Sequence, residues 1–204
     1  NYNASWSAHG YSGNGNVGNL IDSQKNRPAI VAGGAYTVFL DIEEATKVVR
    51  IDDPLIFAVN DVGMFLPEVH HWVSLHPRNL AKWQLVRWLH FGNSVTMHSY
   101  AADNAEWMDW QGLNPLFALS GYFAMQIAWL LGCAPIILAG CPGTTCRRFF
   151  EADAREAAHG EPNVQQQVIM EMNRLPEFKN VVRSMSGWTR EFFRNGGRSQ
   201  WRLL

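Results

Sequence analysis

The chain has 204 residues, of which 47% are hydrophobic and 17% are charged, and its formal net charge is −1 at pH 7. A chain of this length fits one domain that buries a core without disulfides or metals, and its apolar content excludes wholesale disorder. The near-neutral charge excludes a global basic field that would attract nucleic acid or an anionic membrane surface.

The first half of the chain predicts strands that alternate with helices. An Asn-, Gly- and Ser-rich stretch at 1–27 predicts an extension with little regular structure. The domain is expected over 28–188, and its first element is the apolar run AIVAGG at 29–34, which is typical of a buried strand. The elements expected next are a helix over 36–49, strands at 55–61 and 71–77, a helix over 79–91 and a strand at 94–100.

Within the helix expected over 36–49, apolar residues recur at helical spacing and predict one buried stripe. The charged residues between them are expected to face water; they are Asp41, Glu43, Glu44 and Lys47. The stretch 101–119 is expected to be irregular.

A buried helix followed by a buried strand is the clearest signal in the sequence. Ser120 is expected to cap the helix SGYFAMQIAWLL, which is apolar nearly all round, and Gly132 is expected to end it in a left-handed conformation. The apolar run PIILAG at 135–140 then predicts a strand, as in one half of a βαβ unit.

The remaining chain predicts a polar loop after Gly140, a helix that begins at Pro162, a strand and turn at 180–188, and a tail at 189–204. Because strands and helices alternate, the sequence predicts a single α/β domain with a doubly wound, mostly parallel, Rossmann-like sheet. In such sheets ligands bind outside the carboxyl ends of the strands, near the point where the strand order switches.

Two glycines follow the first predicted strand. Gly33 and Gly34 would let the backbone approach a ligand, while the next helix presents free N–H groups to an anion. The alternative is a tight strand-to-helix turn without a ligand. The sequence contains neither the GxGxxG dinucleotide fingerprint nor a P-loop.

Polar residues follow the second and third predicted strands. Asn60 can both donate and accept hydrogen bonds, which suits a base edge or a ribose hydroxyl, whereas Asp61 is more typical of the turn itself. His76 could transfer a proton and Arg78 could pair with a phosphate. For these two residues the alternative is a solvated loop.

Two further places offer anion-binding groups. Ser120 and Gly121 open the buried helix, whose N-terminus attracts anions, although a structural cap explains them equally well. Thr144 and Arg147 lie beyond the strand at 135–140, beside Thr145 and Arg148, where hydroxyl and guanidinium groups could bind phosphate. An ordinary polar loop is the alternative there.

Metal and redox chemistry find little support in the sequence. The 3 cysteines form no dense disulfide framework and lack the spacing of a zinc site, so small thiols in a reducing compartment are expected. The 7 histidines match no metal-binding spacing, and neither a metal nor a cofactor is expected. With no apolar run long enough to cross a bilayer and no secretory signal, the cytoplasm is the expected location. The 9 tryptophans predict an aromatic-lined pocket or a homo-oligomer interface.

The segments LIFAVNDVG, HWVSLHP and SGYFAMQIAWLLGCAPIILAGC resemble the Rossmann-like domain shared by bacterial motility accessory factor proteins and family 42 sialyltransferases. The segment 120–141 together with SMSGWT is still more similar to small uncharacterised proteins of bacteriophages and prophages, for which no activity is established. The first resemblance implies a nucleotide or nucleotide-sugar ligand, CMP-linked in the sialyltransferases. It places Gly33, Gly34, Asn60, Ser120 and Gly121 around the nucleotide.

The chain also departs from these relatives. Gly-Gly-Ala replaces their first glycine loop, and Cys141-Pro142-Gly143 replaces the aspartate and tyrosines that commonly follow their last glycine. The catalytic histidine has no exact counterpart, and His159 is the candidate in that region.

Three hypotheses follow from the sequence. The first is a glycosyltransferase with a CMP-sugar-like donor. It would use His159 or His76 as general base, and Arg147, Arg148 or the helix start at Ser120 on the leaving phosphate. The second is a non-catalytic nucleotide- or sugar-phosphate-binding protein. The third is a phage-type interaction or structural protein on a Rossmann-like fold, since one fold hosts many functions.

Overall fold

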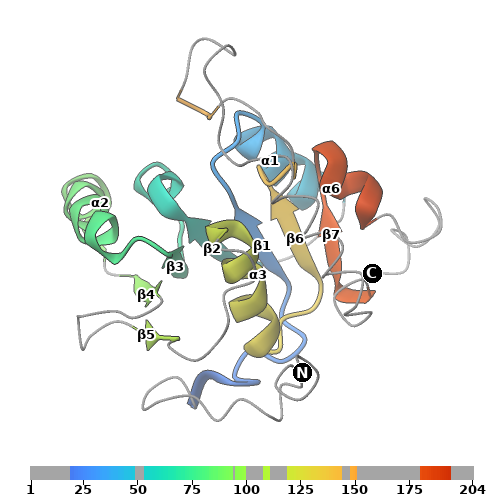
Figure 1. Ribbon diagram of the computed structural model, residues 1–204, viewed down its shortest axis with the longest axis horizontal. Coiled ribbons are helices and arrows are strands. Elements are labelled where there is room, and N and C mark those ends of the chain that lie inside the picture. Colours follow the sequence, from blue (N-terminus) through green and yellow to red (C-terminus); the bar gives the residue numbers. More distant parts are fainter. Residues whose placement is uncertain are drawn as a thin grey trace.

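A computed structural model describes residues 19–48, 53–93, 95–99, 108–110, 119–143, 148–150 and 180–193. Its strands are β1 (Ala29–Ala32), β2 (Leu55–Val59), β3 (His71–Ser74), β4 (Thr96–Ser99), β5 (Met108–Asp109), β6 (Ile136–Ala139) and β7 (Val182–Ser184). Its helices are α1 (Val38–Val48), the 3-10 helix η2 (Asn60–Met64), α2 (Pro77–Phe91), α3 (Ser120–Leu130) and α6 (Gly187–Phe192) (Figure 1).

The strands form one 7-stranded sheet in the order β5-β4-β3-β2-β1-β6-β7, and every neighbouring pair is parallel. From β1 the chain moves outward through β2, β3 and β4 to β5, and then returns to β6 on the other side of β1. The topological switch point therefore lies between the carboxyl ends of β1 and β6. In Figure 1 these ends point toward the top of the view. The predicted doubly wound, parallel α/β fold is confirmed.

Each face of the sheet carries its own hydrophobic core. Alternate strand residues such as Val31 and Phe57 pack with the buried side chains of α3 on one face. Their neighbours, such as Ile30 and Ala58, pack with α1, α2 and η2 on the other face. Because both faces are covered, all the residues of β1, β2 and β6 are buried, which explains their continuously apolar sequences.

The described end of the N-terminal extension lies against the C-terminal turn of α3. The amides of Asp22, Gln24 and Asn26 donate to the carbonyls of Leu130, Leu131 and Gly132, respectively, at 2.7–2.9 Å. These bonds satisfy carbonyls that a helix end leaves without an intrahelical partner. Gly132 has the predicted left-handed conformation, with φ of 85°.

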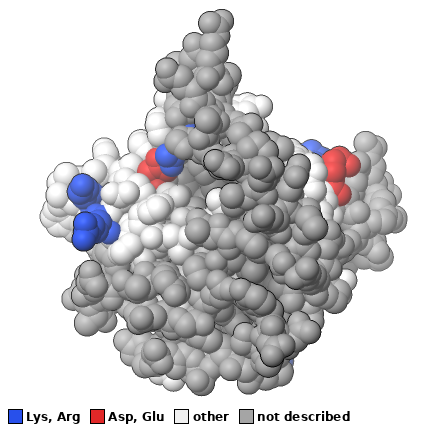
Figure 2. Space-filling model, in the orientation of Figure 1, with Lys and Arg blue, Asp and Glu red and all other residues white. Residues whose placement is uncertain are grey.

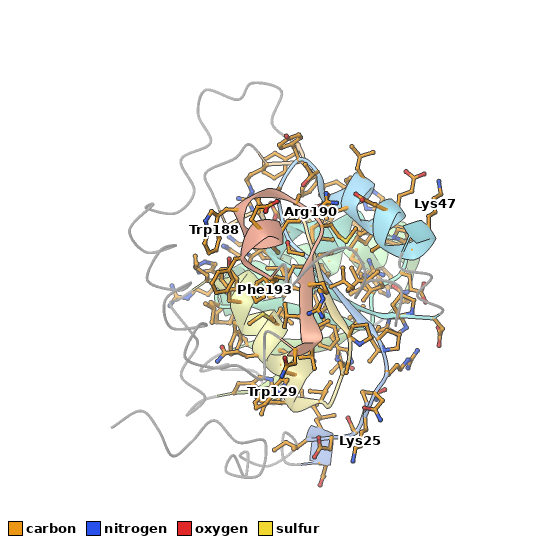
Figure 3. All side chains as sticks on the ribbon, turned by 90° about the vertical axis from the view of Figure 1, so that its right-hand side faces the viewer. Lys25, Lys47, Trp129, Trp188, Arg190 and Phe193 are labelled. Carbon is orange, nitrogen blue, oxygen red and sulfur yellow. The ribbon has the colours of Figure 1, made fainter. Side chains whose placement is uncertain are left out.

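Strand β7 forms the edge of the sheet next to β6, and α6 follows it. Figure 3 shows α6 over β7, with Arg190 on the side of α1 and Phe193 toward α3. Arg190 lies 3.6 Å from Glu44 of α1, and Phe193 is buried in the core on the α3 face. The sequence predicts only a turn and a tail here, because the 6 residues of α6 are too few for a clear helical pattern.

The edge strand β5 was not predicted. Its two residues pair with β4 in the register His98↔Met108 and Ser99↔Asp109, and the amide of Trp110 extends the ladder by donating to Ser99 O at 3.0 Å. Two residues cannot carry the period-2 pattern by which a strand is recognised. The side chain of Trp110 anchors the strand instead, since it is fully buried.

A chain of polar side chains crosses the core beneath β5. Trp110 Nε1 lies 3.0 Å from His98 Nδ1, and His98 Nε2 lies 2.8 Å from His71 Nδ1. Since the indole N–H only donates, His98 Nδ1 accepts, and His98 Nε2–H donates to His71. The ring of His71 stacks on Phe57, with centroids 4.5 Å apart. This arrangement requires both histidines to be neutral, because protonated His98 would have no acceptor for Trp110.

Burial, together with the neighbouring His70 and Arg27, lowers the pKa of His71 to about 4. Burial also holds the pKa of His98 well below its usual value. Below pH 6.5 the unfolded chain therefore binds protons that the folded chain does not. The resulting stabilisation is complete above pH 6.5 and is lost as the pH falls toward 4.

We therefore expect the free energy of unfolding to fall between pH 6.5 and 4, with His71 contributing about 1.4 kcal/mol per pH unit. The measurement is urea unfolding at a series of pH values. His71→Gln keeps an acceptor for His98 but removes one titrating ring, so its slope against pH should be shallower. His90→Gln, which changes an exposed histidine of α2, is the control and should keep the wild-type slope. Equal slopes for wild type and His71→Gln would contradict a neutral buried His71.

Candidate functional site

The structure brings the described candidate residues to one edge of the sheet. Gly33 and Gly34 follow β1, Asn60 follows β2 and His76 follows β3. Ser120 and Gly121 begin α3, which starts at the same edge (Figure 1). The other candidates lie outside the described residues; they are Thr144, Arg147 and His159.

Asn60 has an unusual backbone and a fixed side chain. Its φ of 54° is left-handed, which Asn tolerates better than most residues. Its Oδ1 accepts a hydrogen bond of 2.8 Å from Ser74 Oγ, and its backbone carbonyl accepts one of 2.5 Å from Trp72 Nε1. The hydroxyl of Ser74 itself accepts the His76 amide at 2.9 Å, so its hydrogen is available for Asn60. The Nδ2 amide makes no hydrogen bond to the described residues and is left as a donor.

A further hydrogen bond joins the residue after Ser74 to the start of α3. Leu119 occupies the N-cap position, and the hydroxyl of Ser120 accepts the backbone N–H of Leu75 at 3.3 Å. The prediction that Ser120 caps its own helix is therefore wrong. The Ser120 hydroxyl instead binds the backbone of the turn after β3, because that turn lies within hydrogen-bonding distance of the start of α3. Asn60, Ser74 and Ser120 are thereby held in one connected arrangement.

Gly33 packs tightly against the end of β6 and the residues that follow it. Its amide donates to Ala139 O at 2.8 Å, and a Cβ at this position would lie 2.4 Å from Cys141 Sγ and 2.5 Å from Gly140 O. A Cβ on Gly121 would lie 3.3 Å from the same sulfur. The Cys141 side chain thus fills the space between the end of β1 and the start of α3. Gly34 is more open, since its nearest neighbour would be Arg148 at 3.6 Å.

A buried carboxylate ties α1 to the ends of β6 and β7. Asp41 Oδ2 accepts hydrogen bonds from the Gly140 amide at 2.7 Å, Ser186 Oγ at 2.6 Å and Thr37 Oγ1 at 3.0 Å. Asp41 is only 4% exposed, so the expectation that it faces water is wrong. Its position on α1 is one turn into the helix, where the end of β6 crosses, and no pattern within α1 reveals that crossing.

An ion pair joins the ends of β2 and β6. Arg148 donates to Asp61 Oδ1 at 2.7 Å, and Asp61 is buried. The same segment is fixed by the Phe149 amide, which donates to Gly34 O at 3.1 Å, and by an antiparallel bridge between Ala35 and Arg148. Residues 148–150 therefore lie over the turn between β1 and α1. Asp61 holds the arginine in place, which is more than the turn role expected for it.

The loop that carries Asn60 and Asp61 is fixed by contacts with α2 and β3. Arg87 of α2 is buried and donates to the carbonyls of Gly63 at 2.7 Å and Leu66 at 2.6 Å. A Cβ on Gly63 would lie 2.3 Å from the ring of Trp72, so the loop packs directly on β3. These contacts leave the loop little freedom, which suits a pre-organised binding surface.

Two groups at this edge, the Tyr122 hydroxyl and the His76 ring, differ in their exposure to solvent. Burial raises the pKa of the Tyr122 hydroxyl, and neighbouring Cys141 raises it further, so the hydroxyl stays protonated and can donate. His76 is exposed at the N-cap position of α2. Of the two predicted general bases it is the one that the structure describes.

Comparisons of the chain with family models, curated proteins and solved structures gave no match. The resemblance to motility accessory factors and sialyltransferases therefore stays a prediction. Within the described residues, no three or more metal-ligating side chains lie together, and none of the helices is long and apolar enough to cross a membrane. What the described edge offers is hydrogen-bond donors, a helix start and the guanidinium groups of Arg78 and Arg148, which together can bind an anionic, hydroxyl-bearing molecule.

Asp41→Ala tests the buried carboxylate. It leaves the buried Gly140 amide without an acceptor, and we expect the free energy of unfolding to fall by about 3 kcal/mol. Glu43→Ala on the exposed side of α1 is the matched control and should change it by less than about 0.5 kcal/mol. Chemical denaturation measures both variants. A loss below about 1 kcal/mol for Asp41→Ala would mean that water replaces the carboxylate.

Substitution of Gly33 and of Gly34 by alanine tests how closely other atoms pack against each glycine. We expect Gly33→Ala to lower the free energy of unfolding by about 2 kcal/mol or more, because the new methyl group overlaps Cys141 and Gly140. Gly34→Ala has ordinary contact distances and should cost less than about 1 kcal/mol. Equal effects of the two substitutions in thermal unfolding would argue against the close approach of β1 and β6.

Proposed function

We propose that this protein binds a nucleotide or a nucleotide-sugar at the carboxyl edge of its sheet. The observation that carries the proposal is Asn60. Its Oδ1 accepts a hydrogen bond from Ser74, its backbone is held in a left-handed conformation, and its Nδ2 amide makes no hydrogen bond to the described residues and remains a donor. Backbone strain at such a position is typical of functional sites, and an oriented amide donor suits a base carbonyl or a ribose hydroxyl.

Electrostatic features of the same edge support an anionic ligand. The first residues of α3, Ser120 and Gly121, place helix N–H groups and the positive end of the helix dipole there. Arg148 adds a guanidinium group. Because Cys141 fills the space beside Gly33, the ligand is expected to lie further out, over Gly34 and Asn60.

A glycosyltransferase reaction with a CMP-sugar-like donor is the catalytic form of this proposal. It is supported by the resemblance of the sequence, and its general base would be His76 or His159, with Arg147 on the leaving phosphate. The cytoplasm is the proposed location, because three cysteines without a dense disulfide framework suit a reducing compartment.

An interaction protein is the second candidate function. One observation favours it: Leu85, Trp88 and Leu89 are exposed on α2. They lie three and four residues apart, so they share one helix face. Exposed apolar patches of this kind are typical of protein contacts, including those between identical subunits.

The nucleotide proposal is tested by thermal unfolding in the presence of CMP, UMP, GMP, AMP and their sugar conjugates. We expect at least one of them to raise the melting temperature, because a ligand that binds only the folded state stabilises it. Asn60→Asp keeps the acceptor for Ser74 and tolerates the left-handed backbone but loses the amide donor, so it should abolish the shift. Asn79→Asp, on the exposed start of α2, is the control and should preserve it. The absence of a shift with every nucleotide would favour the interaction protein.

A further inference from the structure

Exposed aromatic side chains occur in the segments that flank the Asp61–Arg148 ion pair. Tyr36 follows β1 and is 48% exposed, Phe65 follows β2 and η2 and is 49% exposed, and Phe150 follows β6 and is 56% exposed. The segment that carries Phe150 lies over the turn after β1, because Arg148 forms a bridge with Ala35 and the Phe149 amide donates to Gly34 O. With the half-buried Phe149 at their centre, these four residues are called the aromatic rim.

Phe149 packs edge to face with Phe65 and Phe150 of the rim and with Phe39 of α1. Phe149 lies 5.2 Å from Phe65, with the ring planes at 70°, and 5.1 Å from Phe150, with the planes at 88°. The guanidinium of Arg148 lies 5.1 Å from the centre of the Phe150 ring. In an edge-to-face pair each ring keeps at least one face uncovered by the other, and such a face is a surface for stacking.

The rim is built into the site. The amide of Phe149 is bonded to Gly34 O at 3.1 Å, and the loop that carries Phe65 is fixed through the buried Arg87. These hydrogen bonds fix the positions of Phe149 and of the loop that carries Phe65. In Figure 2 most of the atoms that are not drawn in grey belong to uncharged residues.

We propose that the aromatic rim stacks against the base of the bound ligand, which makes the ligand a nucleotide or nucleoside rather than a sugar phosphate. This inference rests on the proposed function. Flat aromatic faces next to an amide donor and a guanidinium are what a base with an attached sugar and phosphate requires. A sugar phosphate alone would leave the rim in water, where exposed aromatic surface is unfavourable.

The test compares CMP, UMP, AMP and GMP with ribose 5-phosphate by isothermal titration calorimetry. We expect the preferred nucleotide to bind wild-type protein at least about tenfold more tightly than ribose 5-phosphate, because stacking adds to its affinity. Phe150→Leu and Phe65→Leu keep an apolar side chain but remove the ring. Each should weaken nucleotide binding by about fivefold or more and leave ribose 5-phosphate unchanged.

Trp88→Leu is the matched control, because it removes an exposed ring from α2 near the amino edge of the sheet, and it should leave nucleotide binding unchanged. Circular dichroism and thermal unfolding identify any variant that fails to fold, and having two rim variants keeps the test decisive. Nucleotide binding that neither rim variant weakens would overturn the stacking proposal and leave the nucleotide site standing, as would equal affinities for nucleotides and ribose 5-phosphate. A wild-type protein that binds no nucleotide would overturn both.

Discussion

The contact between the ends of β1 and β6 is the constraint on which the rest of this structure depends. The two strands lie side by side in parallel register, from Ala29↔Ile136 to Ala32↔Ala139. Beyond them Gly33 and Gly140 approach so closely that neither has room for a Cβ, and Gly140 has a left-handed φ of 63°. The carboxylate of Asp41 fixes this crossing by accepting the Gly140 amide. Since β1 and β6 flank the switch point, their contact decides where every other carboxyl-edge residue lies.

The closed crossing also shapes the site. In dinucleotide-binding sheets the glycines after the first strand leave room for a pyrophosphate. Here Cys141 occupies that room, between Gly33 and Gly121. The polar groups available to a ligand lie further along the edge, at Asn60, Gly34 and Arg148. Their positions follow from the loop after β2, which Trp72 and Arg87 hold, and from the segment 148–150, which is bonded to Gly34.

The edge of the sheet around β5 is organised differently, by polar groups inside the core. Trp110, His98 and His71 form a directional hydrogen-bonded chain in which each buried polar atom that it joins has a partner. Such a chain specifies which side chains meet, because a rearranged core would leave donors and acceptors unpaired. It also makes the packing of a two-residue strand depend on the neutrality of two histidines.

The sequence by itself determined the α/β class, the buried helix α3 that begins at Ser120, the strands β1, β2 and β6, and the strand end at which Asn60 lies. These follow from local signals, since periodicity, continuous apolar runs and glycines act within a few residues. Tertiary structure decided the edge strand β5, the burial of Asp41, the use of Ser120 by Leu75 rather than by its own helix, and the pairing of Asp61 with Arg148. The last three of these join residues that are far apart in the chain, such as Asp41 and Gly140. Local patterns carry no information on such partners, because only the return of the chain from β5 to β6 brings them within hydrogen-bonding distance.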